Sequence, residues 1–136
     1  MESFTEIVVR GYHVDMYGHV NNARYLEFLE EGRWASFESR IDLEKWAAMG
    51  LGFMVVNINV NYRKAAVPGE RLQVSTVLEK IGSRSATLKQ EIRLAQTGDI
   101  VVDALVTFVI ADKRGKLVIM DDFISGELLK LEQKAA

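Results

Sequence analysis

The spacing of hydrophobic residues changes once along this chain, and that change constrains its fold more than any other feature. From Asn22 to Glu38 the chain is rich in helix-forming residues, with apolar side chains at helical spacing. This pattern predicts one long and largely buried helix. Further along the period becomes two, and Ile58, Val60 and Tyr62 alternate with asparagines, as in a β-strand. The sequence therefore predicts a helix followed by a sheet, an α+β domain.

Several segments of this strand type follow one another and are separated by turns. The expected strands are Met54–Tyr62, Leu72–Glu79, Thr87–Leu94 and Ile100–Ala111. In the first of them we expect Met54 and Val56 on the same face as Ile58. Short connections predict antiparallel pairing, because a parallel crossover needs a dozen residues or more, so we expect the strands to form a meander. The last segment is almost continuously apolar, which predicts a central place in the sheet.

Shorter elements complete the prediction. A first strand is expected over Glu6–Tyr12, a short helix capped by Asp42 over Leu43–Met49, and a final amphipathic helix over Phe123–Gln133. One apolar helix and an antiparallel sheet bury each other most simply when the sheet curls around the helix. With 136 residues, no linker and no repeat, the chain is expected to form a single domain over residues 1–136.

The composition excludes several classes of function. The formal net charge is −2, so no electrostatic field favours nucleic acid or an anionic membrane. The absence of cysteine excludes disulfides, cysteine-ligated zinc and thiol nucleophiles. No apolar run reaches the roughly 18 residues of a membrane span, and the first residues lack the pattern of a signal peptide; we expect a cytoplasmic protein. A domain of this size leaves little interior for a large ligand, so a large substrate is expected to need a partner subunit.

Polar side chains with catalytic potential gather in the loop before the long helix. They are Tyr12, His13, Asp15, Tyr17, His19, Asn21 and Asn22. The first N–H groups of a helix carry partial positive charge and can stabilise an anion or an oxyanion. Asp15 is the candidate acid–base group beside them. Two alternatives remain: these residues serve only as turn formers and helix caps, or His13, Asp15 and His19 bind a metal ion.

The segment from Val9 to Glu30 contains the block Asp-Met-Tyr-Gly-His-Val-Asn-Asn at residues 15–22. It resembles the opening of hotdog-fold acyl-CoA thioesterases of the 4-hydroxybenzoyl-CoA thioesterase type. Val56–Arg63 and Asp103–Phe108 are similar, more narrowly, to bacterial long-chain acyl-CoA thioesterases of the FadM type. The resemblance covers nearly the whole chain. It implies a hotdog fold, in which an antiparallel β-sheet is wrapped around one long central helix, and an assembly that is a homodimer at minimum, with a homotetramer as the alternative.

The resemblance also implies roles for individual residues. Asp15 would be the catalytic carboxylate, acting as nucleophile or as general base for water, and a backbone N–H at Asn22 or its neighbours would contact the oxyanion. One branch of the family has a histidine where this chain has Asn22. We expect His19 first to hold the loop by hydrogen bonding, with a catalytic role as the second interpretation. Another branch uses a helix glutamate, and we expect the nearby glutamates here to be structural or surface residues: Glu27, Glu30 and Glu31.

Binding of CoA requires cations for its phosphates. Two expected turns supply candidates, namely Arg63, Lys64, Lys80, Ser83 and Arg84, although ordinary solvated turns have the same composition.

Three asparagines at alternate positions form a further feature of the first long strand. They are Asn57, Asn59 and Asn61. Because asparagine is disfavoured in strands, we expect a dimer contact or the substrate to satisfy these amides, and Asn57 is our candidate for a substrate contact.

The expected function is hydrolysis of medium- to long-chain fatty acyl-CoA to free fatty acid and CoA. A thiol such as the leaving group has a pKa of ~8.5, so it departs without a strong general acid. One carboxylate and one oxyanion donor therefore suffice, and we expect no metal and no redox cofactor. The alternatives are a hydratase or dehydratase acting on acyl thioesters and a non-catalytic acyl-CoA-binding module.

Overall fold

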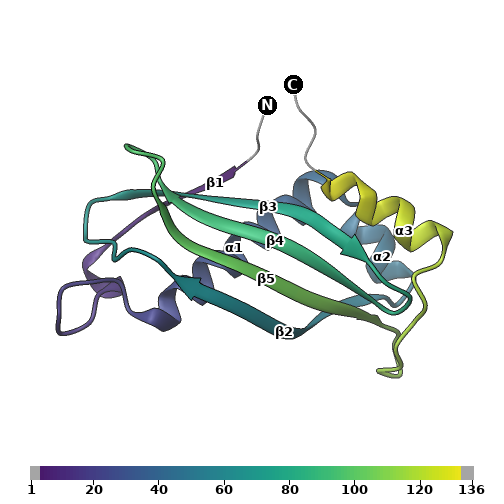
Figure 1. Ribbon diagram of the computed structural model, residues 1–136. Coiled ribbons are helices and arrows are strands. Elements are labelled where there is room, and N and C mark those ends of the chain that lie inside the picture. Colours follow the sequence, from purple (N-terminus) through teal and green to yellow (C-terminus); the bar gives the residue numbers. More distant parts are fainter. Residues whose placement is uncertain (1–3, 133–136) are drawn as a thin grey trace.

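A long helix, α1 (Asn22–Arg40), lies against one face of a five-stranded antiparallel sheet (Figure 1). The computed structural model describes residues 4–132. The strands are β1 (Phe4–Val8), β2 (Gly52–Tyr62), β3 (Arg71–Ile81), β4 (Ser85–Leu94) and β5 (Ile100–Ala111). The shorter helices are α2 (Leu43–Ala48) and α3 (Asp122–Leu128), with single 3₁₀ turns at Gly11–His13 and Leu129–Leu131. The expected α+β arrangement, a sheet wrapped around one helix, is confirmed.

The strands are ordered β1-β3-β4-β5-β2 across the sheet. Among residues 4–132, β3, β4 and β5 form a meander, whereas β2 pairs with β5 and its other edge pairs with no described strand. The predicted meander is therefore wrong for β2. The segment 63–70 carries the chain from one side of the sheet to the other, as Figure 1 shows. The central place expected for the strand at Ile100–Ala111 is confirmed, since β5 lies between β4 and β2.

Two strand details differ from the predictions. The first strand ends at Val8 instead of Tyr12, because the chain turns into a 3₁₀ helix at Gly11. In β2 a bulge between Val55 and Asn57 inserts an extra residue, and this exchanges the two faces of the strand before that point. Phe53 therefore packs against the core, and Met54 and Val56, which we expected on the same face as Ile58, are exposed.

The ends of the helices follow local signals. Asp42 caps α2 as expected, accepting the Lys45 N–H at 3.1 Å. The final helix begins at Asp122 and changes to a 3₁₀ turn after Leu128; its expected end, Gln133, lies outside the described residues. Within residues 4–132 there is no helix with the length and apolar character that a membrane crossing requires.

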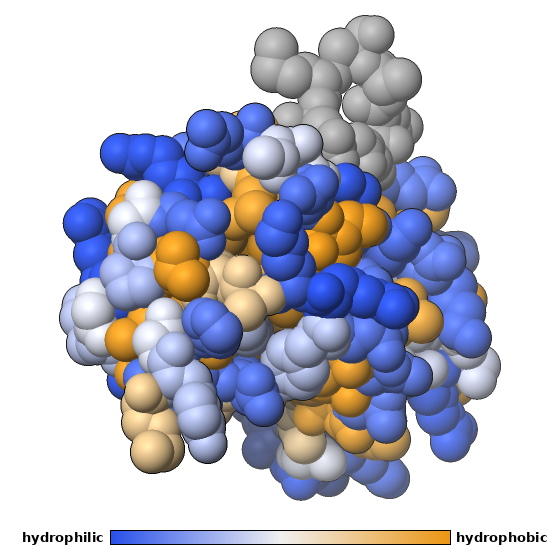
Figure 2. Space-filling view, turned by 60° about the vertical axis from the view of Figure 1, so that its left-hand side comes forward, coloured by the Kyte–Doolittle hydropathy of each residue, from blue (hydrophilic) through white to orange (hydrophobic). Residues whose placement is uncertain are grey.

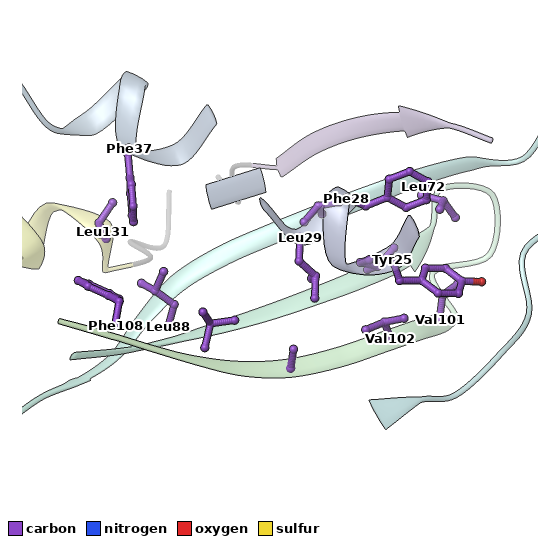
Figure 3. Close-up of a cluster of buried hydrophobic side chains, with 14 of the residues drawn as sticks. Tyr25, Phe28, Leu29, Phe37, Leu72, Leu88, Val101, Val102, Phe108 and Leu131 are labelled. Atoms are coloured by element: carbon purple, nitrogen blue, oxygen red, sulfur yellow. The ribbon is translucent and has the colours of Figure 1, made fainter. Parts of the chain in front are cut away.

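One face of α1 is buried against the sheet. Figure 3 shows Leu29 pointing from the helix toward the strands, and Phe37 near Phe108 and Leu131 at one end of the core. Tyr25 and Phe28 lie at the other end with Leu72. Each large side chain that is fully buried contributes about 1.5–3 kcal/mol. This burial fixes the rotation of α1, and with it the direction of the loop at its start.

A buried polar group holds α1 to the middle of the sheet. The amide nitrogen of Gln90 donates to the Leu29 carbonyl at 2.9 Å and to the Thr76 hydroxyl at 2.8 Å. Its oxygen accepts from Nη1 of Arg33 at 3.1 Å. Gln90 is fully buried, so each of these bonds replaces a bond to water that burial removed.

Candidate active site

The loop before α1 is a tight hairpin closed by backbone hydrogen bonds. The Asp15 N–H donates to the His19 carbonyl, and the Gly18 N–H donates to the Asp15 carbonyl, both at 3.0 Å. Val14 and Val20 form a bridge at its base. Gly18 has a φ of +79°, a conformation that glycine adopts without steric cost. The Asp-x-x-Gly spacing of the motif therefore produces the turn that presents Asp15.

Asp15 combines a structural role with an available carboxylate oxygen. Its Oδ1 accepts the backbone N–H of Tyr17 at 2.9 Å, which is the Asx turn expected of an aspartate at this position. The side chain is exposed, and within residues 4–132 its Oδ2 accepts no hydrogen bond. Asp15 is thus a turn former through its Oδ1, and its Oδ2 remains available for a reaction.

The start of α1 offers one free donor beside this loop. Asn21 caps the helix: its Oδ1 accepts the Ala23 N–H at 2.9 Å and its carbonyl accepts the Arg24 N–H at 2.8 Å. The N–H of Asn22 donates to no group in the described part of the chain. The partial positive charge of a helix is concentrated at such N–H groups. The side chain of Asn22 is exposed and plays no part in capping, while its carbonyl accepts from the Tyr62 hydroxyl at 3.4 Å.

His13, and not His19, holds the loop. Nδ1 of His13 accepts the Arg10 N–H at 2.9 Å, and its carbonyl accepts the Asn21 N–H at 2.9 Å. The ring is buried and packs edge-on against Phe28. Burial lowers the pKa of His13, and the positive charge of Arg24 lowers it further.

His19 has a different environment. Its side chain is exposed and makes no hydrogen bond with any residue from 4 to 132. The expectation that its side chain holds the loop is therefore wrong: only its backbone carbonyl does so. The sequence has no signal that separates the two histidines, because the difference arises from packing against Phe28.

The alternative of a metal site finds no support in the geometry. Among residues 4–132, no three His, Cys, Asp or Glu side chains lie close enough to hold a metal ion. Nδ1 of His13 is already occupied by the Arg10 N–H.

Arg63 and Lys64 follow β2 directly, at the end of the sheet where the loop and the start of α1 lie (Figure 1). Both are in exposed ion pairs: Nε of Arg63 lies 2.7 Å from Oδ2 of Asp103, and Nζ of Lys64 lies 2.8 Å from Oδ2 of Asp99. Exposed pairs of this kind are weak, so a phosphate can compete for either cation.

The other proposed cations are elsewhere. Lys80, Ser83 and Arg84 lie at the turn between β3 and β4, at the opposite end of the sheet from the loop (Figure 1). A single chain therefore does not bring these residues together with Asp15.

The asparagine row of β2 lies on the outer face of the sheet, since the intervening Ile58 and Val60 pack toward the core. Asn61 is satisfied within the chain, because its Nδ2 donates to Oδ1 of Asp103 at 2.9 Å. Asn57 and Asn59 are exposed, and their side chains have no hydrogen bond within residues 4–132. Asn57 is thus on the face of the sheet opposite α1.

The glutamates of α1 are exposed, as we expected of surface residues. Glu27 pairs with Arg24, and Glu30 accepts the indole N–H of Trp34 at 3.2 Å. Glu31 is exposed on the same helix.

Large side chains are exposed around the loop. Tyr12, Met16 and Tyr17 are 71%, 89% and 77% exposed. The end of the molecule that carries the loop comes forward in Figure 2, where hydrophobic side chains lie in patches between hydrophilic ones. Met16 and the rings of Tyr12 and Tyr17 therefore give the loop around Asp15 an exposed apolar surface.

A cavity of about 590 Å³ lies between α1, α2 and β2. Its wall is mainly aromatic and aliphatic and includes Phe37, Leu43, Trp46, Leu51, Phe53 and Phe108. Glu30 and Arg33 supply polar groups. The cavity opens to solvent, since Trp34 and Val55 in its wall are exposed. The sequence pattern did not reveal the cavity, because residues that line a void and residues that fill a core are equally apolar.

Comparisons with known proteins show the family of this chain. Residues 9–128 match the family described as the thioesterase-like superfamily. The chain is 46% identical to the long-chain acyl-CoA thioesterase FadM of Escherichia coli K12 over 130 residues, which cover 95% of this chain and 96% of that protein.

Two solved structures are similar to this chain over nearly the whole of both chains. YbaW, a probable thioesterase from Escherichia coli, has a TM-score of 0.89 at 43% identity, covering 96% of this chain and 98% of that one. A 1,4-dihydroxy-2-naphthoyl-CoA thioesterase from Synechocystis has a TM-score of 0.82 over the same shares of the two chains. At 17% identity, the second structure bears on the fold alone.

Proposed function

The chain belongs to the thioesterase-like superfamily and is an acyl-CoA thioesterase, and we propose that Asp15 and the N–H of Asn22 carry out the hydrolysis. The observation that supports this assignment most directly is the unpaired Asn22 N–H at the start of α1. It is next to a loop whose Asp15 has an oxygen without a partner in the described chain. A helix N-terminus can stabilise the oxyanion of thioester hydrolysis, and a carboxylate can act as its general base or nucleophile.

In the proposed reaction the thioester oxygen accepts a hydrogen bond from the Asn22 N–H. As the carbonyl carbon is attacked, negative charge develops on that oxygen, and the partial positive charge of the helix stabilises it. The C–S bond then breaks and CoA leaves as a thiolate, which takes up a proton from solvent. A donor of this kind contributes roughly 10²- to 10³-fold in rate.

Asp15 acts in one of two ways. As general base it removes a proton from water, and the resulting hydroxide attacks the carbonyl carbon. As nucleophile its oxygen attacks directly, giving a mixed anhydride and CoA thiolate, and water then cleaves the anhydride to fatty acid and restores the carboxylate. Turnover in ¹⁸O-labelled water tests the nucleophilic route: when water cleaves the anhydride at the Asp15 carboxyl carbon, ¹⁸O enters Asp15, whereas the general-base route places ¹⁸O in the fatty acid alone.

The substrate is proposed to be a medium- to long-chain fatty acyl-CoA, in line with the substrate named for the Escherichia coli relative. Of the cations named from the sequence, Arg63 and Lys64 lie at the end of the sheet where α1 begins (Figure 1), and we assign the CoA phosphates to them. Ser83, Arg84 and Asn57 remain candidates only if a second subunit brings them to the site.

We propose that the protein is at least a homodimer. The free edge of β2 can continue the sheet into a second copy, and Met54, Val55 and Val56 expose apolar surface along it. Asn57 and Asn59 on the same strand also have amides available for such a contact. Sedimentation equilibrium should give a mass of two chains or of four, and the mass of a single chain would contradict the proposal.

The decisive test of the site compares thiol release from hexadecanoyl-CoA by the native protein and by Asp15→Asn. Asparagine keeps the oxygen that accepts the Tyr17 N–H, so the turn should survive while activity falls at least about 10²-fold. Asp112→Asn is the matched control, because Asp112 also accepts turn N–H groups, those of Arg114 and Lys116, away from the loop. Equal activity of Asp15→Asn and the native protein would exclude Asp15 as the catalytic group.

A further inference from the structure

The cavity between α1, α2 and β2 takes no part in the site described above. We propose that it binds the distal part of the fatty acyl chain and that the aromatic wall at its α2 end sets the longest chain accepted. This inference rests on the proposed function and deepens it, because it assigns chain-length selection to particular residues.

The lining of the cavity suits a hydrocarbon chain. Phe53 lies between two aromatic rings, with centroids 4.6 Å from Phe37 and 4.7 Å from Trp46, and the three rings are nearly parallel. The stacked rings form one apolar block at the α2 end of the cavity, to which Leu43 and Leu51 add aliphatic surface. A volume of about 590 Å³ is within the range of small-molecule sites.

The two ends of the cavity differ in polarity. Its polar groups, Glu30 and Arg33, are on the part of the wall nearer the start of α1. Arg33 is 9% exposed and uses Nη1 for Gln90. The aromatic wall comes later along the helix, at Phe37, and on α2. A ligand whose polar end is at Asn22 and whose apolar end is deep in the cavity matches this order.

The distance along α1 explains why only a long chain would use the cavity. At 1.5 Å per residue, Glu30 is about 12 Å and Phe37 about 22 Å along the helix from Asn22. A four-carbon acyl group held at Asn22 does not reach the cavity, whereas a sixteen-carbon chain extends into it. Occupation would remove the methylene groups of the chain from water, so each added methylene that reaches the cavity strengthens binding.

Substitutions on α2 test this without removing a core side chain. Ala47 lines the cavity and its neighbour Ala48 does not, and both are exposed. Ala47→Trp should lower kcat/KM for hexadecanoyl-CoA at least about tenfold and leave butanoyl-CoA within twofold. Ala48→Trp should change neither. A loss for Ala47→Trp that is equal on both substrates, or no loss on either, would overturn the proposal.

A binding measurement separates this proposal from the catalytic one. The two tryptophans of the chain, Trp34 and Trp46, both line the cavity, so native fluorescence reports its occupation. Hexadecyl-CoA thioether, which cannot be hydrolysed, should change the fluorescence below its micelle-forming concentration, and butyl-CoA thioether should not. If the fluorescence responds but no acyl-CoA is hydrolysed, the cavity assignment stands and the catalytic one fails. If hydrolysis proceeds and the fluorescence is unchanged, the cavity assignment fails alone.

Discussion

Nδ1 of His13 accepts the backbone N–H of Arg10 at 2.9 Å, and this bond requires the ring to be neutral at that nitrogen. Burial lowers the pKa of His13 in the folded protein. The unfolded chain therefore binds more protons below the ordinary histidine pKa of about 6.5, and unfolding becomes easier there. The bond connects the two ends of the 3₁₀ turn that leads into the loop carrying Asp15.

We predict that the contribution of His13 to the free energy of unfolding is constant above pH 6.5. This contribution falls as the pH drops below 6.5 and through the lowered pKa of His13. Denaturant titrations between pH 7.5 and 5 measure the effect. In His13→Gln the fall over this range should be smaller than in the native protein. His19→Gln, at an exposed histidine of the same loop, should fall as the native protein does; an unchanged slope in His13→Gln would contradict the assignment.

Replacement of Gly32 by alanine should destabilise the fold. A Cβ there would lie 2.5 Å from Cγ1 of Val74 and 3.3 Å from Nε2 of Gln90, so α1 or β3 must move. Overpacking costs about 1–3 kcal/mol, which exceeds the gain of about 1 kcal/mol in helix propensity. Gly126→Ala in α3 is the control: no atom lies within 4 Å of its added Cβ, and the free energy of unfolding should rise slightly. Equal effects in urea titrations would argue against the close contact.

Gln90→Leu should lower the free energy of unfolding by at least about 2 kcal/mol. The substitution removes a hydrogen-bond partner from the buried Arg33 guanidinium and from the buried Thr76 hydroxyl. Urea titration at pH 7.5 measures this. Gln96→Leu, in the exposed turn between β4 and β5, should change stability by less than about 0.5 kcal/mol. A Gln90→Leu protein as stable as the native one would show that the buried group contributes nothing to the fold.

Asp103→Asn should strengthen CoA binding. Asp103 holds Arg63 at 2.7 Å, and the same pair lowers the pKa of Asp103 and raises that of Arg63. Without this carboxylate, Arg63 is free for a phosphate, and KM for acyl-CoA should fall roughly two- to fivefold. Arg63→Gln should raise KM instead.

The control for the CoA prediction is Glu6→Gln, which releases Arg71 from a pair of similar length (2.8 Å) between β1 and β3. It should leave KM unchanged. If both charge-removing variants lower KM equally, the effect is one of net charge and not of Arg63.

Short-range signals in the sequence were enough to predict most of the helices and strands of this protein. Apolar spacing identified α1 and the long strands, and Asp42 and the asparagines before α1 identified two helix starts. These features depend on neighbours a few residues away, which a sequence shows directly. The candidate carboxylate and the helix start were found for the same reason.

The tertiary structure alone decided how those elements meet. The pairing of β2 with β5 joins residues that are 40 positions apart at Tyr62↔Val102 and 59 apart at Gly52↔Ala111, and the bulge at Val55 follows from fitting one strand to the other. The same packing buried His13 and exposed His19, paired Arg63 with Asp103, and left a cavity beside Trp46. A local pattern records which side chains are apolar or charged. Which of them come into contact depends on the packing of the whole chain, because burial and ion pairing are properties of distant neighbours.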